Sequence, residues 1–173
     1  MSISPIFLRD ATKEDAATLA AFAADTFRQA FQRTTSVEQI EEYIHKACGE
    51  AIQRREIEGS NVKVILAEFQ EPTKAMLVGY AQITVDRATA STQLNRIYVE
   101  SGWYGKGVAA TLLDRVLWEC HLCGSKRLWL VVLHRNERAI AFYKKVGFRV
   151  SEEMSVPWGH DVEACLVMEL SCK

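Results

Sequence analysis

The sequence predicts an α/β protein built on a mixed β-sheet with helices on both of its faces. Three observations lead to this fold class. Leu19, Ala23 and Phe27 recur at the three- and four-residue spacing of an amphipathic helix. Residues 61–69 and 76–85 read as two strands of a hairpin. The continuous apolar run 128–133 is typical of a strand buried on both faces.

The first third of the chain predicts one short strand and two helices. Residues 5–9 read as the strand. Thr12 and Asp15 have the spacing of a capping box that opens a helix, and Ser36 and Gln39 repeat that spacing at the start of a second one. The second helix has an apolar stripe made of Val37, Ile40, Ile44, Ala47 and Ala51.

Turn and cap residues delimit the elements that follow. In chain order we expect a turn at 71–74, a strand over 94–99, a glycine-rich turn at 102–107, a helix from there to Gly124, the buried strand 128–133, a helix from the Asn136 cap to Gly147, and strands at 148–150 and 165–170. The predicted order is β-α-α-β-β-β-α-β-α-β-β. At 173 residues the chain suits a single domain spanning 1–173.

The charge and composition of the chain argue against two kinds of partner, nucleic acid and membrane. The formal net charge is −1, so no overall field would attract nucleic acid or an anionic membrane. The N-terminal residues do not resemble a signal peptide, and no apolar run reaches the ~18 residues of a membrane span. We therefore expect a cytoplasmic protein with no nucleic-acid or membrane partner.

The five cysteines predict free thiols, because their number is odd and their spacing is irregular. Cys120 and Cys123 form a C-x-x-C pair around His121. A zinc site would need a second such pair or paired histidines downstream, and none follows at a suitable spacing. We therefore predict no metal site.

The glycine-rich turn carries the strongest functional signal. Gly105 and Gly107 stand where a strand ends and a helix begins, and Ala109 is the next small residue. A helix N-terminus presents unpaired N–H groups and a positive dipole end, and glycine lets an anion approach the backbone closely. The pattern indicates a main-chain phosphate site, although tight turns also favour glycine for geometry alone.

Two other phosphate motifs fit this turn less well. The sequence has no G-x-x-x-x-G-K-[ST] run, which a P-loop requires. Residues 105–110 match the dinucleotide fingerprint formally. About 65 residues remain after the turn, too few for the usual series of βα units, and no acidic residue lies in 125–133 to bind a ribose.

Residues 104–109 resemble the acyl-coenzyme A signature Q/R-x-x-G-x-G/A of the GNAT N-acetyltransferases. Gly107 would be the core glycine and Ala109 the small residue, while Tyr104 replaces the usual Gln or Arg. Backbone amides carry most of the pyrophosphate binding in that family, so we expect this replacement to be tolerated. The segment 136–148 is similar to a second family block, N-x-x-A-x-x-F/L-Y-x-K/x-x-G-F.

Within this superfamily the chain most resembles the PaiA-like polyamine acetyltransferases. The similarity lies in the strand at 94–99, in Thr26 to Phe31, and in the segment 159–168. Cys165 stands where that branch tends to carry an acidic residue. The resemblance implies transfer of an acetyl group from acetyl-CoA to a small cationic amine in a ternary complex, with Asp161 and Glu163 attracting the amine.

The resemblance also implies roles for individual residues. A backbone N–H within 97–99 would stabilise the carbonyl oxygen, or make an ordinary strand hydrogen bond. Tyr143 would protonate the leaving thiolate, or serve as a core tyrosine beside Ile140 and Val146. Asn136 would contact the cofactor, cap its helix, or both. The implied cofactor-binding residues are Ile97, Tyr98, Val99, Tyr104, Gly105, Lys106, Gly107, Val108, Ala109, Asn136 and Tyr143.

Three alternatives stay open at this point. The acceptor is either a small amine such as a polyamine, or the N-terminus or a lysine of a protein. A chain that only binds acyl-CoA, without transferase activity, is a hypothesis from a different class. A homodimer is an expectation from the family resemblance.

Overall fold

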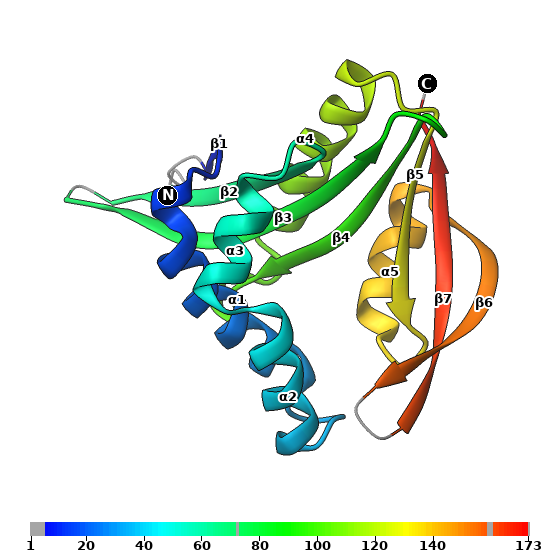
Figure 1. Cartoon of the computed structure of the whole chain (residues 1–173), viewed down its shortest axis with the longest axis horizontal. Coiled ribbons are helices and arrows are strands. Elements are labelled where there is room, and N and C mark those ends of the chain that lie inside the picture. The colour runs from blue at the N-terminus through cyan, green and yellow to red at the C-terminus, as the bar shows by residue number, and fades with distance from the viewer. Residues whose placement is uncertain (1–5, 72, 159–160, 173) are drawn as a thin grey trace. The chain divides into compact units, whose positions relative to one another are not determined.

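The computed structural model of the protein describes residues 6–71, 73–158 and 161–172. Its principal elements are β1 (Ile6–Asp10), α1 (Ala16–Phe31), α2 (Val37–Ala47), α3 (Glu50–Ile57), β2 (Val62–Gln70), β3 (Ala75–Asp86), β4 (Ser91–Val99), α4 (Val108–Leu122), β5 (Arg127–Leu133), α5 (Glu137–Val146), β6 (Arg149–Trp158) and β7 (Asp161–Ser171) (Figure 1). Backbone pairing gives the strand order β1-β2-β3-β4-β5-β7-β6. Because β4 and β5 are parallel while β5 and β7 are antiparallel, the sheet is mixed and the predicted fold class is confirmed.

The chain divides into two compact units, and each is discontinuous in sequence. Unit 1 consists of Met1–Ile83 and Arg96–Val116, and unit 2 of Thr84–Asn95 and Leu117–Lys173. The strands β3 and β4 and the helix α4 contribute residues to both units. A single domain over 1–173 stays a prediction.

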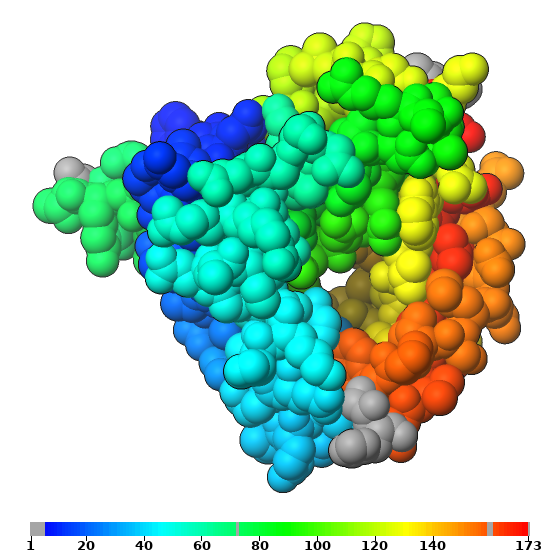
Figure 2. Space-filling view, in the orientation of Figure 1, coloured from blue at the N-terminus to red at the C-terminus, as the bar shows by residue number. Residues whose placement is uncertain are grey.

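Unit 1 contains β1, β2 and the three N-terminal helices. The strand β1 pairs with β2 in antiparallel register from Ile6↔Phe69 to Asp10↔Ile65. Its apolar core includes Leu19 and Ala23 of α1 with Val64, Leu66 and Tyr80. In Figure 1, α3 lies on the viewer's side of β2 and β3, and Figure 2 shows α2 and α3 exposed on that side.

Both predicted helix starts in unit 1 are confirmed. The backbone N–H of Thr12 donates to the Asp15 carboxylate at 2.8 Å, and the backbone N–H of Gln39 donates to the Ser36 hydroxyl at 3.3 Å. A 3-10 turn over Lys13–Asp15 precedes α1. Local side-chain caps therefore fix where these helices begin, as the sequence indicated.

The second predicted helix is in fact two helices. It breaks at Cys48, and Gly49 is the N-cap of α3, with extended backbone angles. The predicted apolar stripe is partly wrong. Ile40 is buried, but Val37 and Ala51 are exposed, while Gln53 is buried and its side-chain amide donates to the Ala47 carbonyl at 2.9 Å.

Unit 2 combines β5, β7 and β6 with α5, which lies along β5 and β7 in Figure 1. β5 pairs with β7 from Arg127↔Ser171 to Leu133↔Cys165. The helix α5 ends at Gly147, as predicted, with a φ of 113°. There the backbone N–H of Phe148 donates to the Tyr143 carbonyl at 3.0 Å, which satisfies one of the last helical carbonyls.

The last two strands are longer than the sequence predicted. β6 is a sheet edge and pairs with β7 from Arg149↔Glu169 to Trp158↔Asp161, with an irregularity between Val150 and Glu152. Most of its residues are exposed, so it lacks the alternating apolar pattern that reveals a strand. Parts of the expected elements, at positions 5, 72 and 159, lie outside the described residues.

No helix among the described residues is long and apolar enough to cross a lipid bilayer.

Candidate active site

The turn between β4 and α4 in unit 1 has the conformation that the sequence indicated. A 3-10 turn over Ser101–Trp103 follows β4, and α4 starts at Val108. Gly105 has a φ of 75° and Gly107 a φ of 85°, backbone angles that favour glycine. A Cβ atom at either position would meet no atom within 4 Å. The glycines therefore set the backbone conformation and leave the space above the turn open.

This turn presents unpaired donors. Within the part of the chain that the structure describes, the backbone N–H groups of Gly105, Gly107, Val108 and Ala109 donate to no acceptor. The N–H of Thr111 is the first of the helix to be paired, with the Gly107 carbonyl at 3.0 Å. Free N–H groups at the positive end of a helix dipole favour an anion such as a phosphate.

Side chains around the turn add a cation and aromatic surface. The Lys106 ammonium lies 4.8 Å from the centre of the Trp103 ring, which packs in turn on Phe69 at 4.8 Å between centroids. Tyr104, which replaces the expected Gln or Arg, is 37% exposed. The local chemistry thus combines main-chain donors with one ammonium group, and both suit an anionic ligand.

Gly79 of β3 allows α4 to pack closely against the strand. A Cβ atom there would lie 3.0 Å from Val108 Cγ1, 3.1 Å from the Tyr98 carbonyl oxygen and 3.2 Å from Leu112 Cδ1. Any larger residue would push back the first turn of α4, which carries the unpaired N–H groups. Sequence reasoning missed this residue, although a glycine inside a predicted strand signals close backbone approach.

The strand residues 97–99 lie directly before the turn. Val99 is 8% exposed, and Tyr98 stacks on Tyr80 at 6.0 Å between ring centroids. The backbone N–H of Glu100 continues the pairing to β3 by donating to the Val78 carbonyl at 3.0 Å. The Glu100 carboxylate accepts a hydrogen bond from the Gly102 N–H at 3.4 Å, so this carboxylate caps the 3-10 turn.

A largely buried ion pair anchors the same strand to α3. The Arg96 guanidinium donates to both Glu56 carboxylate oxygens, at 2.7 and 3.2 Å, and the two side chains are 13% and 22% exposed. Arg96 also donates to the hydroxyl of Tyr43, whose pKa is raised by burial. This contact fixes the strand immediately before residues 97–99.

In unit 2, Asn136 caps α5. Its side-chain oxygen accepts a hydrogen bond from the Ala139 N–H at 3.2 Å. The capping interpretation of this residue is therefore correct. Because the cap uses the amide oxygen, the side-chain NH₂ group can still donate to a ligand.

Tyr143 lies in α5 and is 7% exposed. Its ring contacts Phe142 and Phe148, each at 5.4 Å between centroids, whereas Val146, expected beside it, is 37% exposed. Among the described residues, none forms a hydrogen bond with its hydroxyl. Burial raises the pKa of Tyr143 above its ordinary value, so the phenol stays protonated at neutral pH.

One of the two acidic residues expected to attract a cation is held in an ion pair. Glu163 of β7 forms an ion pair with Arg135 at 2.9 Å. Cys165, at the position where an acidic residue was expected, is 3% exposed and faces the Glu163 carbonyl with its thiol at 3.8 Å. Burial raises the pKa of Cys165, which therefore supplies no negative charge at neutral pH.

Comparison with known proteins identifies the class of protein to which the chain belongs. Residues 9–159 match the family model of the acetyltransferase (GNAT) domain. An uncharacterised N-acetyltransferase of Mycobacterium tuberculosis is 29% identical over 158 residues, which are 90% of this chain and 98% of that protein.

Solved structures with the same fold are more distant in sequence. The PaiA N-acetyltransferase of Thermoplasma acidophilum, in complex with coenzyme A, aligns with a TM-score of 0.81 and 22% identity over 96% of this chain and 99% of that one. A SpeG spermidine N-acetyltransferase variant from Vibrio cholerae aligns with a TM-score of 0.69 and 18% identity over 96% and 93%.

The fold and the family match define an acetyl-CoA-dependent N-acetyltransferase. The chain belongs to the GNAT acetyltransferase family.

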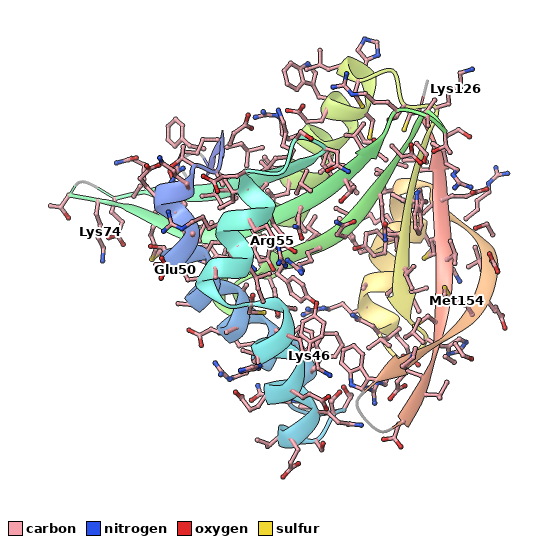
Figure 3. The ribbon with its side chains drawn as sticks, viewed as in Figure 1. Lys46, Glu50, Arg55, Lys74, Lys126 and Met154 are labelled. Carbon is pink, nitrogen blue, oxygen red and sulfur yellow. The ribbon has the colours of Figure 1, made fainter. Side chains whose placement is uncertain are left out.

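We predict that Glu56→Gln lowers the free energy of unfolding by about 2–4 kcal/mol, because it leaves the buried Arg96 charge without its partner. Urea denaturation of the variant and the wild type measures this difference in the free energy of unfolding. Glu50→Gln is the control on the same helix (Figure 3). Glu50 pairs with Arg54 at 3.0 Å, and the two side chains are 53% and 45% exposed. Loss of this exposed pair should lower the free energy of unfolding by less than about 1 kcal/mol. Equal losses in both variants would contradict the assigned role of the buried pair.

Proposed function

We propose that the chain transfers the acetyl group of acetyl-CoA directly to the primary amine of a small cationic molecule, with polyamines as the favoured class. The cofactor part of the proposal is carried by one observation, the unpaired N–H groups at the start of α4. The acceptor part is supported by the likeness to the structure of the SpeG spermidine N-acetyltransferase variant. Glu163 is paired with Arg135 and Cys165 is a neutral thiol, so the charge that attracts the amine would have to come from other groups.

The residues present fit the cofactor. The turn 104–109 would bind its pyrophosphate through the main chain, since Gly105 and Gly107 leave open space where a Cβ would stand. Lys106 would add one positive charge, and the side-chain NH₂ group of Asn136, which the cap does not use, would donate a further hydrogen bond. When bound, acetyl-CoA supplies the reactive thioester carbonyl.

The chain supplies two further groups to the reaction. A backbone N–H within 97–99 would donate to the carbonyl oxygen as negative charge develops on it, a contribution worth ~3–4 kcal/mol in related sites. The Tyr143 hydroxyl has no protein partner among the described residues, so its proton is available for the departing thiolate. Its raised pKa keeps that proton in place before transfer, although it also makes the phenol a weaker acid.

We predict that Gly107→Val weakens acetyl-CoA binding by tenfold or more, about 1.4 kcal/mol, because the side chain fills the open space above the turn. Isothermal titration calorimetry measures the dissociation constant. Gly124→Val is the matched control, since Gly124 also has a positive φ of 70° and open space around a Cβ but lies beyond the other end of α4. If both variants fold and bind acetyl-CoA as the wild type does, the turn is not the binding site.

We predict that Tyr143→Phe lowers kcat by about 10²–10⁴, the usual cost of losing a general acid. The ring contacts with Phe142 and Phe148 are kept, so acetyl-CoA affinity and stability should change little. The penalty should shrink with an acyl donor whose thiol is more acidic, because a better leaving group needs less protonation. If Tyr143→Phe keeps a near-normal kcat while the chemical step is rate-limiting, Tyr143 has only a packing role.

The acceptor is tested by comparing kcat/KM for spermidine, spermine, putrescine, an aminoglycoside and peptide N-termini. The proposal predicts the highest values for polyamines. A preference of more than tenfold for a peptide, about 1.4 kcal/mol of transition-state discrimination, would favour a protein acetyltransferase instead. Binding of acetyl-CoA without turnover of any amine would favour a non-catalytic acyl-CoA-binding protein.

A further inference from the structure

Three of the five cysteines come together at one end of unit 2. Cys120 belongs to the last turn of α4, Cys123 follows that helix, and Cys172 follows β7. The sequence shows only the C-x-x-C pair, because Cys172 lies about fifty residues further along the chain. In Figure 3, Lys126 lies at one end of β7, which marks this end of the unit.

Backbone hydrogen bonds hold Cys120 and Cys172 to the same short connection. The Cys120 carbonyl accepts from the Ser125 N–H at 2.9 Å, and the Cys172 N–H donates to the Lys126 carbonyl at 2.9 Å. The two cysteines are therefore bonded to consecutive residues, and each thiol is the other's side-chain hydrogen-bonding partner. This contact between Cys120 and Cys172 has no part in the proposed acetyl transfer or in the capping of the helices.

The surroundings distinguish the three thiols. Cys120 is fully buried, and burial raises its pKa to about 12. Cys172 is half-buried, and burial raises its pKa as well. Burial also acts to raise the pKa of Cys123, but hydrogen bonds between its thiol and the hydroxyls of Ser125, at 3.1 Å, and Thr92, at 3.8 Å, outweigh burial and lower that pKa. Within the described residues, no group of three or more His, Cys, Asp or Glu side chains can hold a metal ion.

We propose that Cys120 and Cys172 form a reversible disulfide when the protein meets a two-electron oxidant such as hydrogen peroxide. Half-buried Cys172 is the entry point, since Cys120 has no access to solvent. The Cys172 thiolate attacks one peroxide oxygen and becomes a sulfenic acid, while the other oxygen leaves as hydroxide. The Cys120 sulfur then attacks the Cys172 sulfur and water departs.

The overall reaction balances. Two thiols and one hydrogen peroxide give one disulfide and two water molecules, so the sulfurs are oxidised by two electrons and the peroxide is reduced by two. A thiol such as dithiothreitol reverses it by exchange. The bond would join the end of α4 to the end of β7 and close a loop of about fifty residues, which should stabilise the folded chain. Disulfides of reducing compartments are usually transient ones of this kind.

The experiment treats the full-length protein with hydrogen peroxide and measures its intact mass under denaturing conditions, followed by peptide mapping. Trypsin leaves Cys120 and Cys123 together in 116–126, and Cys165 and Cys172 together in 150–173. Mapping is therefore done in a Cys123→Ser background, where a cross-link from the first peptide must come from Cys120. Cys172→Ser and Cys165→Ser identify the cysteine of the second peptide.

The proposal predicts a monomer that has lost two hydrogens, carries a link between 116–126 and 150–173, melts at a higher temperature than the reduced form and reverts with dithiothreitol. The link should persist in Cys123→Ser and Cys165→Ser and vanish in Cys172→Ser and Cys120→Ser. Cys172 lies outside every helix and strand, so Cys172→Ser tests the proposal even if Cys120→Ser does not fold. A Cys120–Cys123 bond, a covalent dimer, adducts on Cys123 alone, or no loss of hydrogens would each overturn it.

Discussion

The close packing of α4 against β3 at Gly79 is the contact on which the proposed cofactor site depends. A Cβ there would come within 3.0–3.2 Å of Val108, Leu112 and the Tyr98 carbonyl, so the contact positions both the first turn of the helix and the adjoining strand. The unpaired N–H groups of α4 and the backbone of residues 97–99 are then placed by the same contact. The Arg96–Glu56 ion pair adds a second restraint on that strand from α3. Packing in unit 1 thus preorganises the main-chain donors, with little dependence on side chains at the turn itself.

This arrangement explains why the replacement at Tyr104 is compatible with the family. In the proposed site the donors are backbone N–H groups, so the side chain at the first position of the signature would contribute little to binding. The proposed binding of a cationic amine would instead depend on charged side chains. There Glu163 is paired with Arg135 and Cys165 is a buried neutral thiol, so neither side chain supplies an unpaired negative charge for the amine.

Sequence reasoning succeeded where the signal was local. The caps at Thr12, Ser36 and Asn136, the end of α5 at Gly147 and the glycine turn are each set by a few neighbouring residues. It failed where distant segments decide the outcome. The apolar spacing runs through Gly49, so periodicity could not show the break between α2 and α3. The exposed edge strand β6 has no apolar alternation, and the neighbours of Gly79 and Cys120 come from other parts of the chain.

The central claim is that main-chain N–H groups at the start of α4 bind acetyl-CoA, and amide nuclear magnetic resonance tests it most directly. A titration of the ¹⁵N-labelled protein with coenzyme A reports on every backbone N–H at once. The account predicts that the largest changes in amide chemical shift fall on Gly105, Gly107, Val108 and Ala109, with Gly124 little affected. Unchanged signals from these four residues at saturating coenzyme A, with the large changes located elsewhere, would contradict it.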